Sequence, residues 1–262
     1  MPELPEVETQ LVFFRRTAIG KCVERVVVTA PNIIRNPTAR VFARRLRGRC
    51  FVDISRRGKY LISTLDDGHK LILHFGMGGD LAYYKLPGER PAYTRIEFIL
   101  TNGWRLGFTC PRKICRVMLV EDIAGVPALR EMGPEPLGNA FSLAFLQRLL
   151  EERPRRQIKP LLMDQKMIAG VGNIYADEIL FEARVRPDRA ASSLSQDEIR
   201  RIHRETRRVL KRSIRTAADP DFPADFLVSR DARGGVCGVC GSVIEKKKIG
   251  GRTSHFCSHC QI

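Results

Sequence analysis

Four cysteines near the end of the chain form the feature that most restricts how the sequence can fold. They stand as two CxxC pairs separated by the length of a β-hairpin, Cys237-x2-Cys240-x16-Cys257-x2-Cys260. Four thiolates at this spacing fit tetrahedral coordination of one Zn²⁺ ion in a closed, structural site. A redox or iron–sulfur site is the main alternative, which paired CxxC motifs around a hairpin disfavour. His255 and His259 lie nearby, but four thiolates leave no vacancy, so we expect both to be non-ligands.

The chain is strongly basic along its whole length. It has 262 residues and a formal net charge of +16 at pH 7. Residues 1–150 contain 23 basic and 14 acidic side chains, and residues 151–262 contain 22 and 15. This balance favours a polyanionic partner, although thermophilic and ribosomal proteins share it. Nucleic acid is the favoured partner because the sequence has no apolar run long enough to enter a membrane. With an acidic start and no apolar leader, we expect a cytoplasmic protein.

The hydrophobic pattern changes from strand-like to helical near the middle of the chain. Alternating apolar residues and turn signals predict successive strands, at 22–28, 48–55, 60–65, 70–75, 95–100, 104–108 and 117–120. Helical spacing begins near Ser142 and continues through a basic helix over 194–214. The pattern predicts an α+β protein whose first part is a sandwich of two sheets with a helix over the first residues at its edge. We expect the cysteines Cys22, Cys50, Cys110 and Cys115 to be small buried hydrophobic residues without a role.

The first residues carry groups suited to covalent chemistry. Pro2 follows the initiator Met, which is normally removed before so small a residue, so the mature chain would begin with a secondary amine. An α-amino group titrates at about 7.7–8.0, so a useful fraction is neutral and nucleophilic near pH 7. Glu3 and Glu6 would lie close to this amine at the start of a helix. An ordinary capped helix with an unremarkable terminus is the other interpretation.

The segment MPELPEVE resembles the N-terminus of the formamidopyrimidine-DNA glycosylases. In that family the N-terminal proline is the nucleophile and the following Glu is the essential acid/base, which implies these roles for Pro2 and Glu3. Glu6 would support the site. The related endonuclease VIII proteins typically have Gly at the fourth position, where this chain has Leu4. Similarity extends over essentially the whole chain, through the segments RRGKYL, HFGMGG, GPEPL, GVGNIYADE and the C-terminal finger.

The resemblance implies that Lys59 and Arg252 are catalytic residues together with Pro2 and Glu3. It implies a role in DNA binding for six further residues: Glu6, Met77, Arg112, Ile114, Lys159 and Asn173. Lys59 approaches the DNA backbone at the lesion, Met77 fills the space left by the extruded nucleotide, and Arg112 contacts the orphaned base. Ile114 stands where the family usually has an inserting Phe, and Cys110 replaces an Asp. By the same resemblance, Lys159 and Asn173 bind the phosphates that flank the lesion. Arg252 of the finger reaches the DNA near the scissile phosphates. Residues 217–235 cover the everted base in the family; the match there is poor, and Arg233 is a candidate only by its position.

The family organisation implies three segments. These are an N-terminal β-sandwich catalytic domain (1–132), a helix–two-turn–helix DNA-binding domain (133–222), and a loop with the four-cysteine zinc finger (223–262). We expect a monomeric, nucleoid-associated, bifunctional glycosylase and AP lyase that excises oxidised purines from damaged double-stranded DNA in base excision repair. Two alternatives remain open, an endonuclease VIII-type enzyme for oxidised pyrimidines and a catalytically silent zinc-finger DNA-binding protein.

Overall fold

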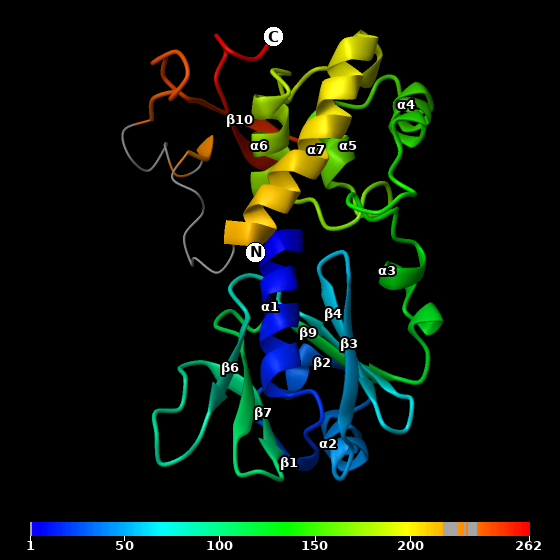
Figure 1. Ribbon diagram of the computed structural model, residues 1–262, viewed down its shortest axis with the longest axis vertical. Helices are drawn as coiled ribbons and strands as arrows, with labels where there is room; N and C mark the ends of the chain where they lie inside the picture. Colours follow the sequence, from blue (N-terminus) through cyan, green and yellow to red (C-terminus); the bar gives the residue numbers. More distant parts are fainter. Residues whose placement is uncertain (1, 217–224, 228, 230–234) are drawn as a thin grey trace. The chain divides into compact units, whose positions relative to one another are not determined.

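The computed structural model describes residues 2–216, 225–227, 229 and 235–262 (Figure 1). Met1 and Arg233 lie outside the described residues, as does most of the predicted lesion-covering loop. The chain forms two compact units. Unit 1 contains Pro2 and Glu6–Glu131, and unit 2 contains Glu3–Pro5 and Met132–Ile262. The three-segment division expected from the sequence stays a prediction. In the part of the chain that the structure describes, no helix is both long and apolar enough to cross a membrane.

Unit 1 is a β-sandwich with a helix along it, as the sequence predicts (Figure 1). One sheet has the order β1-β7-β8-β6 and is antiparallel. The other has the order β2-β9-β5-β4-β3, and only its β2–β9 pair is parallel. The elements of unit 1 are α1 (Leu4–Thr17, shared with unit 2), β1 (Val23–Val28), β2 (Ile34–Asn36), α2 (Ala39–Leu46), β3 (Phe51–Arg57), β4 (Tyr60–Leu65), β5 (Lys70–His74), β6 (Asp80–Tyr84), β7 (Thr94–Leu100), β8 (Arg105–Thr109), β9 (Arg116–Val120) and α3 (Pro127–Arg130).

Aromatic side chains connect α1 to both sheets. Phe14 of α1 contacts Phe51 of β3 edge-on, with ring centroids 5.1 Å apart. Phe51 in turn meets Phe98 of β7 at 6.0 Å. All three are fully buried, so α1 is fixed by the same apolar core that joins the sheets. The helical spacing of apolar residues in the first segment is therefore explained by packing against the sandwich.

Two loops connect the sheets at one end of the sandwich. The loop over residues 75–79 leads from β5 of one sheet to β6 of the other, and the loop over 110–115 leads back from β8 to β9. The β3–β4 turn lies at the same end, because the strand register places Arg57 beside Tyr60, Tyr60 beside His74, and His74 beside Arg116. The predicted Lys59, Met77 and Arg112 thus come from three connections at one end of unit 1.

The four cysteines outside the finger form disulfide bonds, which the sequence analysis did not predict. Cys22 is joined to Cys50 and Cys110 to Cys115 by disulfide bonds, so the prediction that these residues have no role beyond filling space is wrong. Cys22 and Cys50 face each other across an antiparallel bridge, while Cys110 and Cys115 close the β8–β9 loop. Such pairings depend on how the strands lie beside one another, which the positions of single cysteines in a sequence do not reveal.

Unit 2 is built from helices around an apolar core and ends in a β-hairpin. Its elements are α4 (Leu143–Glu151), α5 (Ile158–Met163), α6 (Asn173–Glu182), α7 (Gln196–Thr216), β10 (Glu245–Ile249) and β11 (Arg252–Phe256). Ser142 caps α4 by accepting a hydrogen bond from the Phe145 amide at 3.1 Å. Arg207 of α7 donates to the carbonyl oxygens of Pro136, Leu137 and Gly138 at 3.1–3.3 Å, which fastens the GPEPL segment to this helix.

The final hairpin turns at Gly250 and Gly251. Both glycines have positive φ, 56° and 76°, which the tight turn between β10 and β11 requires. A Cβ atom on Gly250 would lie 2.6 Å from Cγ of Pro160. The turn therefore packs directly on α5, and this contact brings Arg252 and the residues after it to the helices of unit 2.

Candidate active site

The Glu3 carboxylate binds the N-terminus of α6. Glu3 is only 3% exposed. Its Oε1 accepts a hydrogen bond from the Ile174 amide at 3.0 Å, and its Oε2 accepts one from the Tyr175 amide at 3.5 Å. Free amides and the helix dipole both favour a negative charge at this position. The residue beside the N-terminal proline is therefore held as an anion by backbone groups of the GVGNIYADE segment.

Two glycines make room for the start of the chain. A Cβ atom on Gly172 would lie 2.3 Å from Cδ of Glu3, so any larger residue would displace the carboxylate. Gly170 has φ +82°, and a Cβ atom there would lie 2.8 Å from the Leu4 side chain. Leu4 is fully buried in the core of unit 2, and its amide donates to the Gly170 carbonyl at 3.1 Å. The GxG pattern, a weak signal by itself, is needed here for close approach to Glu3 and Leu4.

The ammonium group of Lys159 is buried, and other groups of the protein bind it. Its ammonium lies 2.7 Å from Oδ1 of Asp177 and donates to Oγ of Ser254 at 2.7 Å and to the Thr253 carbonyl at 3.3 Å. Its side chain is fully buried. Burial lowers its pKa below the usual value, against the opposing effect of the Asp177 and Glu3 carboxylates. Lys159 therefore holds the hairpin in place, and the phosphate contact expected from the sequence stays a prediction.

Asn173 shares the same hairpin carbonyl. Its Nδ2 donates to the Thr253 carbonyl at 3.0 Å, and its buried Oδ1 accepts no hydrogen bond among the described residues. The neighbouring Arg252 is exposed at the start of β11. Asp177, one helical turn after Asn173, accepts a hydrogen bond from the His255 amide at 3.0 Å. Asn173, Lys159 and Asp177 thus fix the backbone that presents Arg252.

The turn of unit 1 that carries Lys59 lies beside a neutral histidine. Lys59 is 5% exposed. The rings of Tyr60 and His74 lie 4.7 Å apart, and Nδ1 of His74 accepts a hydrogen bond from the Gly76 amide at 3.3 Å. Burial, together with the positive charges of Arg116 and Lys59, lowers the pKa of His74 from 6.5 to about 4. The imidazole is therefore uncharged at neutral pH, and Arg116 and Lys59 supply the positive charge beside it.

We expect this buried histidine to make the protein less stable in mild acid. Between pH 6.5 and about 4 the unfolded chain takes up a proton on His74 that the folded protein does not. The free energy of unfolding therefore falls as pH decreases through this window, by roughly 3 kcal/mol in total. Urea unfolding at several pH values should show this slope in the wild type and a flatter one in His74→Gln. An NMR titration that places the His74 pKa near 6.5 would contradict the assignment.

The two sheet-to-sheet loops expose the side chains predicted to enter the DNA. Met77 is 40% exposed and Ile114 is 46% exposed, both high values for large apolar residues. A guanidinium nitrogen of Arg112 lies 3.6 Å from the Met77 sulfur, so the two loops meet at their tips. Pro2 is partly exposed, and so is Glu6 in the first turn of α1. These roles stay predictions, but the structure brings Met77 and Arg112 together.

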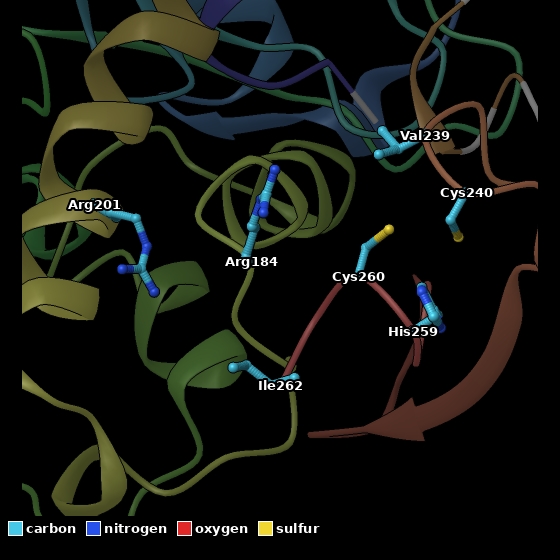
Figure 2. Close-up of a pocket in the computed structure, with 7 residues that line it drawn as sticks. All are labelled: Arg184, Arg201, Val239, Cys240, His259, Cys260 and Ile262. Atoms are coloured by element: carbon cyan, nitrogen blue, oxygen red, sulfur yellow. The ribbon is translucent and has the colours of Figure 1, made fainter.

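The four cysteines of the finger form a metal site. Their Sγ atoms all lie within 4.8 Å of one another, with Cys237–Cys260 at 3.8 Å and Cys240–Cys257 at 3.5 Å. A zinc–sulfur distance of about 2.3 Å gives tetrahedral edges of about 3.8 Å, so the thiols fit Zn²⁺. A pocket of about 670 Å³ is lined by two of these cysteines and by Arg184, Arg201, Val239, His259 and Ile262. Figure 2 shows the two cysteines, Cys240 and Cys260, among the residues that line it. The site is closed by thiolates and has a structural role.

Family models match nearly the whole chain. The formamidopyrimidine-DNA glycosylase N-terminal domain matches residues 1–117, the H2TH domain of the same glycosylases matches 132–220, and the zinc finger found in FPG and IleRS matches 234–262. The chain belongs to the formamidopyrimidine-DNA glycosylase family. It is therefore a DNA glycosylase of DNA repair with one zinc ion in its finger, and the resemblance, fold class and metal expected from the sequence are confirmed.

Relatives and solved structures match this chain over nearly its full length and nearly all of theirs. The formamidopyrimidine-DNA glycosylase of Pelotomaculum thermopropionicum is 38% identical over 274 residues, covering 100% of this chain and 99% of the relative. The MutM (Fpg) protein of Thermus thermophilus superposes with a TM-score of 0.83 at 36% identity, covering 99% of this chain and 98% of the other. Lactococcus lactis Fpg, bound to an AP-site-containing DNA, superposes with a TM-score of 0.87 at 28% identity, covering 99% of both chains.

In each unit, sequence reasoning missed residues that contact the predicted site residues. Asp177 and Ser254 hold Lys159, and His74 and Arg116 surround the Lys59 turn. Asp177 had only an indirect signal in the sequence, its place one helical turn after Asn173 in the GVGNIYADE segment. The others become visible through strand register and the docking of the hairpin.

Proposed function

We propose that this family member is a bifunctional glycosylase and AP lyase that removes oxidised purines, 8-oxoguanine and formamidopyrimidines, from duplex DNA. The observation that carries the proposal is the position of Glu3, which follows Pro2 directly and is held as a buried carboxylate on the amides of α6. Covalent removal of a base requires a nucleophile and a group that transfers protons, and here a fixed acid/base stands beside a nucleophilic amine. Action on duplex DNA would place the protein at the nucleoid.

The chemistry begins with the amine of Pro2. The amine attacks C1′ of an extruded nucleotide, and the bond from C1′ to the damaged base breaks with its electron pair leaving on the base, which takes up a proton. The Glu3 carboxylate takes up the proton that the Pro2 nitrogen loses after bonding to C1′ and transfers it to the sugar ring oxygen as the ring opens. This gives an iminium ion between Pro2 and C1′. The iminium ion withdraws electrons, so a proton is lost from C2′ and the 3′ phosphate leaves. Loss of a second proton, from C4′, then expels the 5′ phosphate.

DNA binding in this proposal uses both units. Lys59, Met77, Arg112 and Ile114 belong to the connections at one end of the sandwich. Arg252 and Asn173 would contact the backbone near the lesion, and Lys159 would act through the hairpin that it holds. Extrusion of the nucleotide costs a few kcal/mol, and the apolar Met77 and Ile114 would offset part of it by filling the gap.

The presence of Leu4 supports a substrate preference for purine lesions over pyrimidine lesions. It is fully buried in the core of unit 2 against Gly170, and its presence separates this chain from the endonuclease VIII pattern with Gly at this position. Solved structures similar to this chain contain carbocyclic 8-oxo-G DNA in one MutM and Fapy-dG DNA in a Lactococcus lactis Fpg variant. We extend these substrates to this protein as part of the proposal.

Borohydride trapping tests the proposal. Reduction of the iminium ion during reaction with an 8-oxoguanine duplex should leave a covalent protein–DNA complex, and Pro2→Gly should abolish it. Undamaged duplex is the control. Faster trapping on thymine glycol than on 8-oxoguanine would support the pyrimidine-specific alternative. Tight binding without any trapped complex would support a catalytically silent zinc-finger protein, and mass spectrometry showing that active protein retains Met1 would exclude the amine mechanism.

A further inference from the structure

The loop that carries Arg112 and Ile114 is closed at its base by a disulfide. Cys110 follows β8 and Cys115 precedes β9, and their bond spans a separation of five residues with Cα atoms 6.2 Å apart. Both cysteines are fully buried. The Cys115 amide donates to Sγ of Cys110 at 3.3 Å, and Arg95 Nε donates to the Cys110 carbonyl at 3.1 Å. The two ends of the loop are thus fixed while its tip is exposed.

The disulfide also lies against the loop that carries Met77. Sγ of Cys115 is 3.1 Å from the Phe75 carbonyl oxygen. A Cβ atom on Gly79 would lie 2.9 Å from the same sulfur, and one on Gly76 would lie 2.9 Å from the Ile114 carbonyl. Gly76 and Gly79 therefore let the two loops touch without intervening side chains. Because the two loops are in contact, any change in the backbone path of residues 110–115 would displace the loop around Met77.

The closed loop holds its tip in an unusual backbone conformation. Lys113, between Arg112 and Ile114, has φ +54°, a value in the left-handed region that few residues other than glycine adopt. Such a conformation persists where the surrounding structure imposes it. Here the surrounding constraint is the bond between Cys110 and Cys115 together with the contact of Arg112 with Met77 at 3.6 Å.

We propose that Cys110 and Cys115 are a positioning pair whose disulfide holds Arg112 and Ile114 ready beside Met77 to fill the gap in damaged duplex DNA. This inference rests on the proposed function and adds a dependence of lesion recognition on the oxidation state of this pair. Closing the loop before binding removes alternative loop conformations, so less binding free energy is spent on ordering it. Oxidising conditions, which damage purines, also favour the closed loop.

The redox step is a two-electron exchange between the sulfur atoms and a thiol or phosphine reagent. A water-soluble phosphine cleaves the Cys110–Cys115 bond, leaving two thiols, and becomes a phosphine oxide with an oxygen atom from water. A small-molecule disulfide, such as oxidised glutathione, reverses the reaction by exchange, releasing two small thiols as the protein disulfide forms. Alkylation and peptide mapping report the state of the pair, with the finger thiolates kept as zinc ligands by saturating zinc.

The test compares two substrates before and after reduction. The first is a duplex with 8-oxoguanine opposite cytosine, which needs the gap-filling side chains, and the second is a single strand with an abasic site, which has no orphaned base. If the open loop is competent in about a tenth of the molecules, reduction raises KM for the duplex about tenfold with kcat nearly unchanged. Cleavage of the single strand should change by less than about twofold, and reoxidation should restore the duplex KM.

Matched variants separate this pair from other effects of reduction. Cys110→Ala/Cys115→Ala should behave like the reduced protein and lose its response to phosphine, whereas Cys22→Ala/Cys50→Ala, which removes the other disulfide, should keep the full response. Thermal unfolding and zinc content show whether each variant is folded. Equal ratios of duplex to single-strand cleavage in oxidised and reduced wild type would overturn the inference, as would equal loss on both substrates.

Binding provides a measurement that does not need catalysis. Fluorescence anisotropy with a duplex containing a tetrahydrofuran abasic analogue and with an intact duplex should show a preference for the analogue that decreases about tenfold on reduction. Unchanged preference contradicts the positioning role. If neither substrate is cleaved in either oxidation state, the proposed function fails, while the redox dependence of this preference still decides the inference.

Discussion

Glu3→Gln is expected to lower the rate of base release from an 8-oxoguanine duplex by about 10³-fold, because positioned acid/base groups contribute 10²–10⁴-fold. Gln has the size of Glu, and its carbonyl oxygen still accepts a hydrogen bond from the Ile174 amide that Glu3 uses. The substitution therefore removes the proton-transferring carboxylate while leaving most of the local packing. Single-turnover kinetics measures the effect without interference from product release.

A matched control for this substitution is Glu24→Gln on β1, an exposed Glu remote in sequence from the proposed site. This variant should retain wild-type rates. Borohydride trapping should follow the same order, with the adduct lost in Glu3→Gln and kept in the control. Base release by Glu3→Gln at a rate within tenfold of wild type, with unchanged thermal stability, would show that another group transfers the proton.

Loss of the zinc ion is expected to unfold the terminal hairpin and weaken binding to damaged duplex by on the order of 100-fold. Structural zinc contributes about 10–16 kcal/mol to the folding of small fingers, far more than a five-residue-per-strand hairpin could replace by itself. Without the hairpin, Arg252 loses its position and Lys159 loses the oxygens of Thr253 and Ser254. Two charge-assisted DNA contacts of about 1.5 kcal/mol each would account for the lost affinity.

Cys257→Ala and His259→Ala form the test pair for the metal site. Cys257 is a predicted ligand and is fully buried, while His259 is its exposed neighbour and not a member of the thiol cluster. Zinc analysis and fluorescence anisotropy should show loss of metal and DNA affinity in Cys257→Ala only. Chelation of the wild type should reproduce the effect, and added zinc should reverse it. A Cys257→Ala protein with a full zinc ion and normal affinity would contradict the assignment.

Patterns that operate over short distances along the chain were readable from the sequence. The CxxC spacing predicts a tetrahedral thiolate site because its ligands come from two tight turns, one on each side of a single hairpin. The strands of the sandwich follow from alternating apolar residues, and Ser142 at the start of α4 follows from its capping ability. The N-terminal MPELPEVE segment identified Pro2 and Glu3 by resemblance.

Contacts between residues far apart in the chain were decided only by the tertiary structure. The sequence does not reveal that the docking of the hairpin some 90 residues later surrounds Lys159 with Asp177, Ser254 and Thr253. Cys110 and Cys115 were expected to be inert, but the turn between β8 and β9 brings their sulfurs into bonding distance. A sequence specifies which side chains can ionise, ligate or bond. Burial and partners, which determine what those side chains do, depend on packing between elements that no local pattern encodes.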